Sequence, residues 1–413
     1  MSEPEQVLIL GFVWPEPDSS AAGQRMMKLI RLFQSEGWEI TFASPAAKSE
    51  FMADLDQLGV ESHEIKVNSS DFDRFVRDLQ PSIVLFDRFV IEEQFGWRVA
   101  QQCPGALRIL DTEDLHCLRR TRRKAVAENR IFNTRDLLGE EVSKREIASI
   151  LRCDLSLIIS EYEMDLLKNL FKVDPVLLHY LPFMENKVDG ATAGNLPGFH
   201  ERRHFITIGN FSHEPNLDSA IYLKREIWPL IHRKLPEAEM LIYGAYPSQK
   251  AWQLHDPETN FLIKGRAESA ESVIKNARVM LAPLRFGAGL KGKLLEAMRC
   301  GTPSVTTDIG VEGMQAGERW SGFTANRPDE LAARAVQLYT QEEEWEKAVS
   351  AGYKIIDEKF ADKKQRSGLI EKISQLQHNL EDHRKNNFTG AMLMHHTMAS
   401  SRYMSRWIEE KNK

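Results

Sequence analysis

Short apolar runs alternate along the chain with segments whose apolar residues recur at helical spacing. The first run, residues 7–13 (VLILGFV), is apolar throughout, as expected of a strand buried on both faces. Met26, Leu29 and Phe33 then recur at the spacing of one helix face, and Gly37 is placed to end that helix. This alternation predicts an α/β fold with a parallel sheet covered by helices on both sides.

The pattern occurs twice, and residues 184–203, rich in Asn, Gly and Pro, separate the two series. A length of 413 residues suits two domains. We therefore predict two Rossmann-like parallel-sheet domains facing a cleft, at residues 1–185 and 204–360, joined by a linker at 186–203. A helix at 361–380 is expected to pack back on the first domain. The tail, 381–413, lacks a clear period, and its role stays open between a frayed end and a partner-binding helix. Further strands are predicted at 38–43, 83–87, 108–110, 155–160, 205–209, 240–244, 261–263, 279–283 and 304–307.

Charge and cysteine usage narrow the class of protein. Lys and Arg number 54 and Asp and Glu 60, a net charge of −6, which argues against general binding of nucleic acid. The four cysteines lie far apart, so neither a structural zinc site nor a disulfide framework is indicated. No apolar run approaches the roughly 18 residues that cross a bilayer, and the first residues are acidic where a signal peptide is basic. We expect a cytoplasmic enzyme.

The most informative segment is 279–314, in which an apolar strand leads into a glycine loop and then a helix. Gly287, Gly289 and Gly292 allow close approach to the backbone, and the helix offers unpaired N–H groups at its start. Lys291 and Lys293 add positive charge, so the segment predicts a site for a phosphorylated ligand. Its spacing also fits the P-loop of nucleotide hydrolases, but leucine follows the second lysine where Ser or Thr would hold Mg²⁺.

The sequence EAMRCGTPSV at 296–305, following that loop, and FITIGNFSHEPN at 205–216 carry a resemblance to a known family. They resemble the nucleotide-sugar half of retaining glycosyltransferases of the GT-B fold, glycosyltransferase family four (glycosyl transferases group 1). The resemblance covers most of 205–360. In the first half it is weaker and rests on the loop before Gly23 and on residues 111–120.

The resemblance implies transfer of a sugar from a nucleotide-diphosphate sugar to a glycan or lipid-linked acceptor. It also implies retention of configuration, no metal, no cofactor beyond the donor co-substrate, and a setting in bacterial surface polysaccharide assembly. Glu296 would bind the ribose hydroxyls, and the backbone of residues 287–289 would meet the donor sugar and phosphate. Further donor-binding positions implied are Gly23, Gly209, Asn210, Gly265 and Arg266.

Two departures from the family pattern affect the donor site. The family usually has a second Glu eight residues before the first, where this chain has Ala288. It also usually has Arg and Lys in the loop after the first strand of this half, where this chain has Gly209, Asn210 and Phe211. Our hypothesis is that Lys291, Lys293 or Arg285 supplies the missing charge.

In the first half, residues 111–116 (DTEDLH) follow a predicted strand, so they lie at its carboxyl end. His116 is the catalytic candidate, able to orient or deprotonate an acceptor or to bind the donor sugar, with Asp114 beside it. Asp111 is a weaker candidate. For His116 the alternative is a capping or surface residue, and for both aspartates it is capping of the following helix.

Residues 116–135 carry seven basic residues and one acid, a local charge of +6 in an acidic chain. Arg119, Arg120, Arg122 and Arg123 are therefore candidates for binding an anionic acceptor or the inner face of the cell membrane, a peripheral location. The alternative is a solvated helix face paired with acids elsewhere.

Two other short motifs are expected to be structural. Asp71 and Asp73 spell the DxD of metal-dependent transferases, but they follow Asn-Ser-Ser and are interpreted as opening a helix. His395 and His396 lack a Cys or carboxylate partner in the sequence around them. Two alternative functions also stay open: a hydrolysing nucleotide-sugar epimerase, and a non-catalytic sugar-nucleotide-binding protein, which the missing carboxylate at Ala288 keeps in view.

Overall fold

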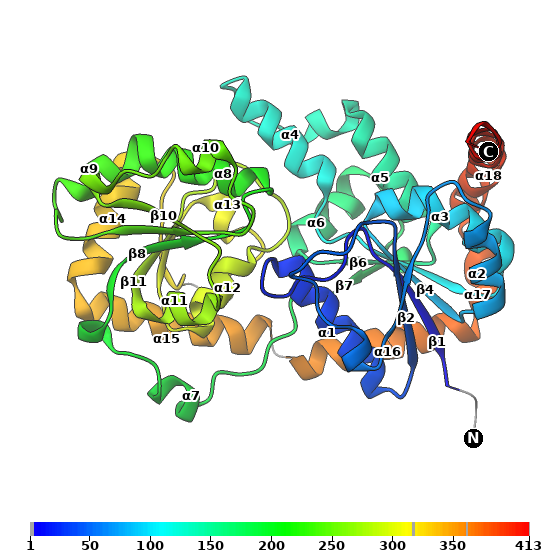
Figure 1. The fold of residues 1–413 in the computed structure, drawn as a ribbon, viewed down its shortest axis with the longest axis horizontal. Helices are drawn as coiled ribbons and strands as arrows, with labels where there is room; N and C mark the ends of the chain where they lie inside the picture. Colours follow the sequence, from blue (N-terminus) through cyan, green and yellow to red (C-terminus); the bar gives the residue numbers. More distant parts are fainter. Residues whose placement is uncertain (1–3, 316–318, 361, 413) are drawn as a thin grey trace.

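A computed structural model describes residues 4–315, 319–360 and 362–412. Residues 1–3 and 413, the outer ends of the first predicted domain and of the predicted tail, lie outside it, as do 316–318 and 361. The chain forms two parallel sheets of seven and six strands, each covered by helices, lying side by side (Figure 1). The predicted fold class, two Rossmann-like parallel-sheet domains, is confirmed.

The first sheet has the strand order β3-β2-β1-β4-β5-β6-β7, and every pair in it is parallel. Its central strands are buried along their length, which is why their sequences read as continuous apolar runs. The bounds are β1 (Gln6–Leu10), β2 (Glu39–Ser44), β3 (Glu61–Glu64), β4 (Ile83–Asp87), β5 (Leu107–Asp111), β6 (Leu155–Ile158) and β7 (Leu178–Tyr180).

Helices of the first half cover both faces of this sheet. The helix predicted from Met26, Leu29 and Phe33 is α1, which begins where the Ser20 side chain accepts from the Gly23 N–H and ends before Gly37, at φ +77°. It packs on one face, and α2, α3 and α5 supply the core on the other. The bounds are α1 (Ala21–Ser35), α2 (Asp71–Leu79), α3 (Phe89–Gln102), α4 (His116–Ala127), α5 (Glu141–Arg152) and α6 (Glu161–Asp165).

The second sheet has the order β10-β9-β8-β11-β12-β13 and is also parallel throughout. Its strands are β8 (Arg203–Ile208), β9 (Met240–Tyr243), β10 (Phe261–Gly265), β11 (Ala277–Ala282), β12 (Ser304–Thr306) and β13 (Gly322–Thr324). Its helices are α8 (Glu214–Tyr222), α9 (Trp228–His232), α10 (Gln249–Trp252), α11 (Ala270–Asn276), α12 (Gly292–Arg299), α13 (Asp308–Val311), α14 (Pro328–Thr340) and α15 (Glu342–Lys359). A short helix, α7 (Gly190–Gly194), lies in the segment between the two sheets.

After α15 the chain returns to the first sheet (Figure 1). Helix α16 (Asp362–His378) places Leu369, Ile373 and Leu376 in the same buried cluster as Ile9 of β1. The two crossings between halves lie together, because the Glu185 N–H donates to the Phe360 carbonyl over 2.8 Å.

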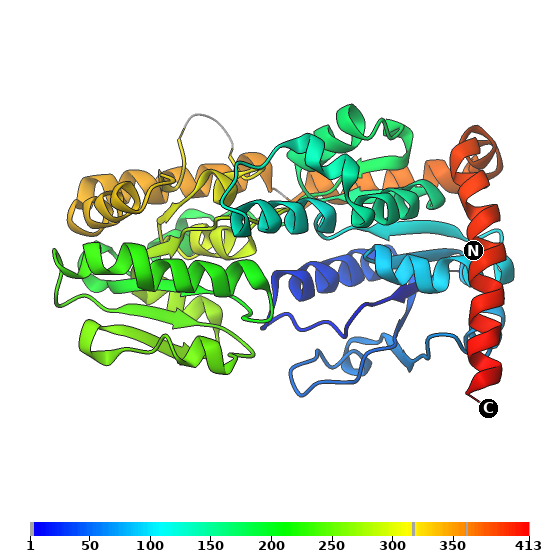
Figure 2. The ribbon, with the colours of Figure 1, turned by 90° about the horizontal axis from the view of Figure 1, so that it is seen from above.

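The last residues form two helices, α17 (Leu380–Asn386) and α18 (Phe388–Lys411), at the outer edge of the first half (Figure 2). Helix α18 packs on α5 and α3. The contacts are a close approach of the backbones and polar pairs, and for this reason the sequence of α18 shows no apolar periodicity. A Cβ at Gly390 would lie 2.0 Å from the Leu151 carbonyl, and Arg98 Nη2 donates to Ser405 Oγ over 2.6 Å. His395 and His396 stack edge-on at 5.7 Å on its exposed side.

Three short strands escaped the sequence pattern: β3, β7 and β13. Each has only three or four residues, and β3 (ESHE) is polar and partly exposed, so apolar content does not mark it. Within the described ranges, every helix is too short or too polar to cross a bilayer.

Candidate active site

A cavity of about 560 Å³ lies between the two halves. Loops at the carboxyl ends of β1, β5, β8 and β11 line it, which is where parallel sheets bind ligands. We call this cavity the cleft. Of the predicted site residues, it brings together Gly209, Asn210, Gly287, Ala288, Gly289, Lys291, Lys293, Glu296, Asp114, His116 and Arg119.

The glycine loop is packed tightly against the first half of the chain. A Cβ at Gly289, where φ is +60°, would lie 2.8 Å from the Asp114 Cβ, and one at Gly292 would lie 2.4 Å from the Ala21 Cβ. Both positions therefore require glycine because the opposite half approaches them. The sequence interpretation assigned these glycines to the approach of a ligand, whereas the structure gives them this packing role as well.

The two lysines of the segment have different surroundings. Lys291 is buried, and its ammonium donates to the Gly289 carbonyl over 2.7 Å, so it supports the loop. Lys293, in the first turn of α12, donates to Asn216 Oδ1 over 2.7 Å. Burial lowers the pKa of Lys291 to about 8 and that of Lys293 to about 7. Lys293 carries no carboxylate partner among the described residues, so its charge is the one an anionic ligand can use.

Glu296 lies on α12, one turn beyond Lys293, and lines the cleft. Its position on that helix follows from Leu294, Leu295, Ala297 and Met298, which are buried on the opposite side. Burial raises the pKa of the Glu296 carboxyl. When it is ionised, the Glu296 carboxylate can accept hydrogen bonds from hydroxyl groups.

Two predicted donor-site arginines lie outside the cleft lining. Arg285 forms an ion pair with Asp218, with Nε 2.9 Å from Oδ2, and its guanidinium lies over the Tyr222 ring. The Arg266 guanidinium stacks on the Phe51 ring of the first half at 4.2 Å. Arg285 is therefore not placed to replace the basic residues missing after β8.

On the opposite wall, His116 begins α4, and its Nε2 lies 3.5 Å from Asp114 Oδ1. Asp114 also forms an ion pair with Arg119, which holds the pKa of the Asp114 carboxyl well below its usual range despite burial. Burial lowers the pKa of His116 to about 3, so its imidazole is neutral at physiological pH. Neutral imidazole can both donate and accept a hydrogen bond.

The helix-capping alternative for the two aspartates is wrong. Glu146 of α5 caps α4, because the N–H groups of His116 and Cys117 donate to its carboxylate over 2.9 and 2.8 Å. Asp111 instead lies fully buried against Arg25 of α1, with its Oδ2 3.0 Å from Arg25 Nε. Asp111 is therefore part of the packing between α1 and β5, away from the cleft lining.

A second carboxylate of the first half reaches into the glycine loop. Glu163 of α6 accepts from the Gly289 N–H over 2.8 Å and from the Leu115 N–H over 2.9 Å, both through Oε1. Glu163 thus joins the loop that carries Asp114 and His116 to the loop that carries the lysines. Burial, with repulsion from Asp114, raises the pKa of Glu163 to about 8.

The basic residues of α4 are largely paired with acids. Arg122 is buried and forms an ion pair with Glu312 of the second half, while Arg123 pairs with Glu214 over 2.5 Å. Arg119 pairs with Asp114, as described above. Of the four predicted membrane or acceptor residues, Arg120 is the exposed one for which the described residues offer no ion pair. The alternative of a helix face paired with acids therefore describes most of this cluster.

The remaining motifs have structural partners. Asp71 and Asp73 lie in the first turn of α2, as expected, and pair with Arg74 and Arg98. Gly23 lines a smaller cavity beside the cleft, where a Cβ would collide with the Glu16 backbone.

Arg88, Glu113 and His213 are ionisable residues of the cleft lining that the sequence did not single out. Glu113 lies between Asp111 and Asp114 in the sequence. Arg88 follows β4, whose carboxyl end is itself a signal for a site. His213 lies in the loop after β8, within residues 205–216, and burial lowers its pKa to about 4.

Comparison with known proteins agrees with this geometry. Residues 202–341 match the family model described as glycosyl transferases group 1. The match confirms, for the second half, the resemblance inferred from 205–216 and 296–305. No curated protein matches the chain.

Solved structures share the fold across most of the chain. HepE of Anabaena, solved with UDP and glucose, has 12% identity and a TM-score of 0.64, covering 90% of this chain and 100% of HepE. Sucrose-phosphate synthase of Thermosynechococcus elongatus has 13% identity and a TM-score of 0.65, covering 90% and 99%. WaaG, a glycosyltransferase involved in lipopolysaccharide biosynthesis, has 11% identity and a TM-score of 0.59, covering 88% and 98%. Identities this low show a common fold, that of GT-B proteins.

Proposed function

We propose that this protein transfers a sugar from a nucleotide-diphosphate sugar to a glycan or lipid-linked acceptor, with retention of configuration and without a metal. One observation carries the proposal. The cleft sets Lys293, Glu296 and the start of α12 on one wall against His116, Asp114 and Arg119 on the other. The wall from the second half lies within the segment that matches the family model.

The departing diphosphate requires positive charge at its oxygens. The start of α12 offers N–H groups and the positive end of the helix dipole, and Lys293 adds an ammonium group there. Such fixed charges stabilise a leaving group without rearrangement at the moment of reaction. Lys293 therefore takes, in this proposal, the role of the basic residues that the family pattern places after β8.

The acceptor wall supplies a hydrogen-bonding group beside the reacting carbon. His116 is neutral, so it can orient an acceptor hydroxyl or receive its proton as the new glycosidic bond forms. Asp114, held ionised by Arg119, fixes the position of the imidazole. In this proposal, closure of the two halves around the bound donor excludes water, which would otherwise hydrolyse it.

The setting proposed is assembly of a bacterial surface polysaccharide. It is supported by the likeness of fold to WaaG, whose role is in lipopolysaccharide biosynthesis. A peripheral contact with an anionic membrane belongs to the same proposal, with Arg120 as the exposed basic residue of α4.

The test is a thermal-shift panel of nucleoside diphosphates and their sugars, followed by product analysis. A correct donor raises the melting temperature because it binds only the folded chain. NMR of the product made with acceptor present reads the anomeric configuration, and the assay is repeated with EDTA. Inversion of configuration would contradict the proposed retention, and loss of activity with EDTA would contradict the proposed independence of a metal. A product formed without acceptor would favour an epimerase, and binding with neither transfer nor hydrolysis would favour a non-catalytic protein.

A further inference from the structure

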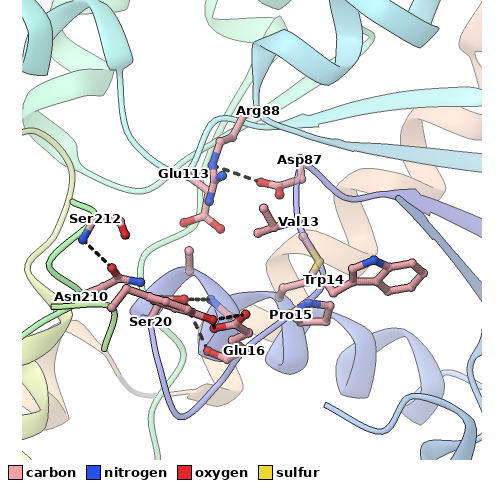
Figure 3. A pocket seen from close by; sticks show the side chains of 14 residues that line it. Val13, Trp14, Pro15, Glu16, Ser20, Asp87, Arg88, Glu113, Asn210 and Ser212 are labelled. Atoms are coloured by element: carbon pink, nitrogen blue, oxygen red, sulfur yellow. Dashed lines mark hydrogen bonds and ion pairs between the residues drawn. The ribbon is translucent and has the colours of Figure 1, made fainter. Parts of the chain in front are cut away.

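A second cavity of about 310 Å³, here called the side pocket, adjoins the cleft (Figure 3). The loops after β1, β4 and β5 line it from the first half, and Asn210, Ser212 and Tyr246 line it from the second. Arg88, Glu113 and Asn210 line both cavities, so the side pocket opens where the cleft begins. Gly23 and Asn210, which the resemblance places at the donor, are among its lining, whereas Lys293 and the start of α12 are not.

In this pocket, one carboxyl oxygen of Asp87 is a buried hydrogen-bond acceptor that no N–H or O–H group of the described residues reaches. The residue ends β4 and is 4% exposed. Its Oδ2 accepts from the Phe12 N–H over 3.0 Å, while Oδ1 has no hydrogen-bond partner within the described residues and only a 3.5 Å contact with Arg88 Nε. In Figure 3 the carboxyl group faces the pocket and Glu113. An unsatisfied buried acceptor costs roughly 1–3 kcal/mol, so a donor from a ligand would be favourable here.

The charge of the side pocket is unsuited to an anion. Glu16, Asp87 and Glu113 line it with carboxyl groups, against the single guanidinium of Arg88. Glu16 already accepts from the hydroxyl of Tyr246 over 2.9 Å, which joins the two halves at the rim. Burial, with repulsion from Asp111, raises the pKa of Glu113 to about 8, so near neutral pH this group is mostly protonated and can donate as well as accept. The carboxyl groups of Glu16 and Asp87 still outnumber the one cation, Arg88. The pocket thus offers acceptors and donors together, the combination that hydroxyl groups require.

The backbone is held in unusual conformations at Arg88 and Glu113, two of the residues that also line the cleft. Arg88 has φ +71° and ψ 155°, and Glu113 has φ +60°, although neither is glycine. Such conformations cost of order 1–3 kcal/mol and cluster at binding and active sites. Here they direct both side chains to the junction of pocket and cleft.

We propose that the side pocket binds an uncharged, hydroxyl-rich sugar ring of the acceptor, an inference that rests on the function proposed above. The volume lies at the lower end for small-molecule sites, as suits a single ring. The ring would give hydroxyl hydrogen bonds to Asp87 and Glu113 and present its reacting hydroxyl toward the cleft. Any phosphate of a lipid-linked acceptor then lies outside this pocket.

The test compares neutral sugars with their own phosphates on the UDP-saturated protein. Glucose, galactose, mannose and N-acetylglucosamine, each paired with its 6-phosphate, are titrated by ligand-observed NMR. We expect at least one neutral sugar to bind about tenfold or more tightly than its phosphate. Phosphates that bind as tightly as the parent sugars, or neutral sugars that do not bind at all, would overturn the inference. Failure of UDP itself to bind would instead contradict the proposed function.

Two substitutions assign the binding to the side pocket. Asp87→Asn is expected to lower the affinity for the neutral sugar about fivefold to tenfold. Glu16→Gln is expected to reduce the ratio between the affinities for the neutral sugar and for its 6-phosphate. Both residues line the side pocket alone, so UDP affinity reports that each variant is folded. Asp71→Asn, an exposed carboxylate on α2, is the matched control and should change nothing. Sugar binding unaltered in both pocket variants would place the ring elsewhere and overturn the inference.

Discussion

Arg122 and Glu312 form a bidentate ion pair between the two halves of the chain, with Nη1–Oε1 2.8 Å and Nη2–Oε2 2.7 Å. Arg122 also donates to the Gly287 carbonyl over 2.9 Å, so α4 is tied directly to the glycine loop. Both side chains are largely buried.

We predict that Arg122→Ala loosens the contact between the halves. Removing one partner of a buried pair typically costs about 3–5 kcal/mol because the other charge is left unpaired. Thermal unfolding should change from one transition to two, or small-angle scattering should report a larger radius of gyration. Arg123→Ala is the control, since its pair with Glu214 also joins the halves but is exposed. Equal effects of the two substitutions would contradict a special role for the buried pair.

Donor affinity should depend on pH through Lys293. Its pKa is lowered to about 7 in the free protein, and the protonated form is the one that attracts the diphosphate. Affinity for UDP-glucose, which does not itself titrate near this pH, should therefore be highest below pH 7 and fall as the pH rises through 7. Calorimetry between pH 6 and 9 measures this. Lys293→Arg keeps its charge over that range, so a pH dependence that persists in this variant would point to another group.

His116→Ala should reduce turnover about 10²–10³-fold while UDP-glucose affinity stays within about threefold, because the imidazole acts on the acceptor side. Since the pKa of His116 is lowered to about 3, the group stays neutral above about pH 4 and adds no pH dependence near neutrality. Steady-state kinetics from pH 5 to 9 check both points. A loss confined to donor affinity would move His116 to the donor site.

Asp111→Asn should destabilise the fold by about 3–5 kcal/mol, because it leaves Arg25 charged and buried without a carboxylate. Urea unfolding measures this, with the exposed Asp71→Asn as control. The folded fraction should retain its donor affinity. Full stability with lost turnover would instead make Asp111 a catalytic residue.

Binding to vesicles of anionic lipid should be weak. Three of the four arginines proposed for membrane contact pair with acids of the chain, and Arg120 is left exposed. Cosedimentation with phosphatidylserine vesicles should therefore respond to Arg120→Ala and be insensitive to Arg123→Ala. Tight binding that survives Arg120→Ala would place the membrane contact on another surface.

The sequence predicted well wherever burial is uniform along an element. The central strands, buried on both faces, and the helix marked by Met26, Leu29 and Phe33 lie where their periodicity placed them. The segment from the glycine loop to Glu296 could be assigned because strand, glycines, lysines and helix follow one another locally.

Relationships between distant residues could not be predicted in this way. Glu146 caps α4, and Glu163 accepts a hydrogen bond from the Gly289 N–H. Neither interaction can be recognised as a sequence motif, because the two partners lie dozens of residues apart. In the sequence, Arg285 and Lys293 are equivalent as cations near the glycine loop. They differ in the structure because Arg285 forms an ion pair with Asp218. Glu113 was missed because its backbone conformation, which directs it into the cleft, is not encoded by its residue type.

The return of α16 to the first sheet has a consequence for how the chain is made. Leu369, Ile373 and Leu376 complete a core that begins at Val7, and Arg384 pairs with Asp154 at the far edge. On the ribosome, the first half is therefore synthesised long before the residues that complete it. We expect a nascent chain released at residue 360 to fold its second half while its first half stays protease-sensitive, so the half made first is the last to reach full stability.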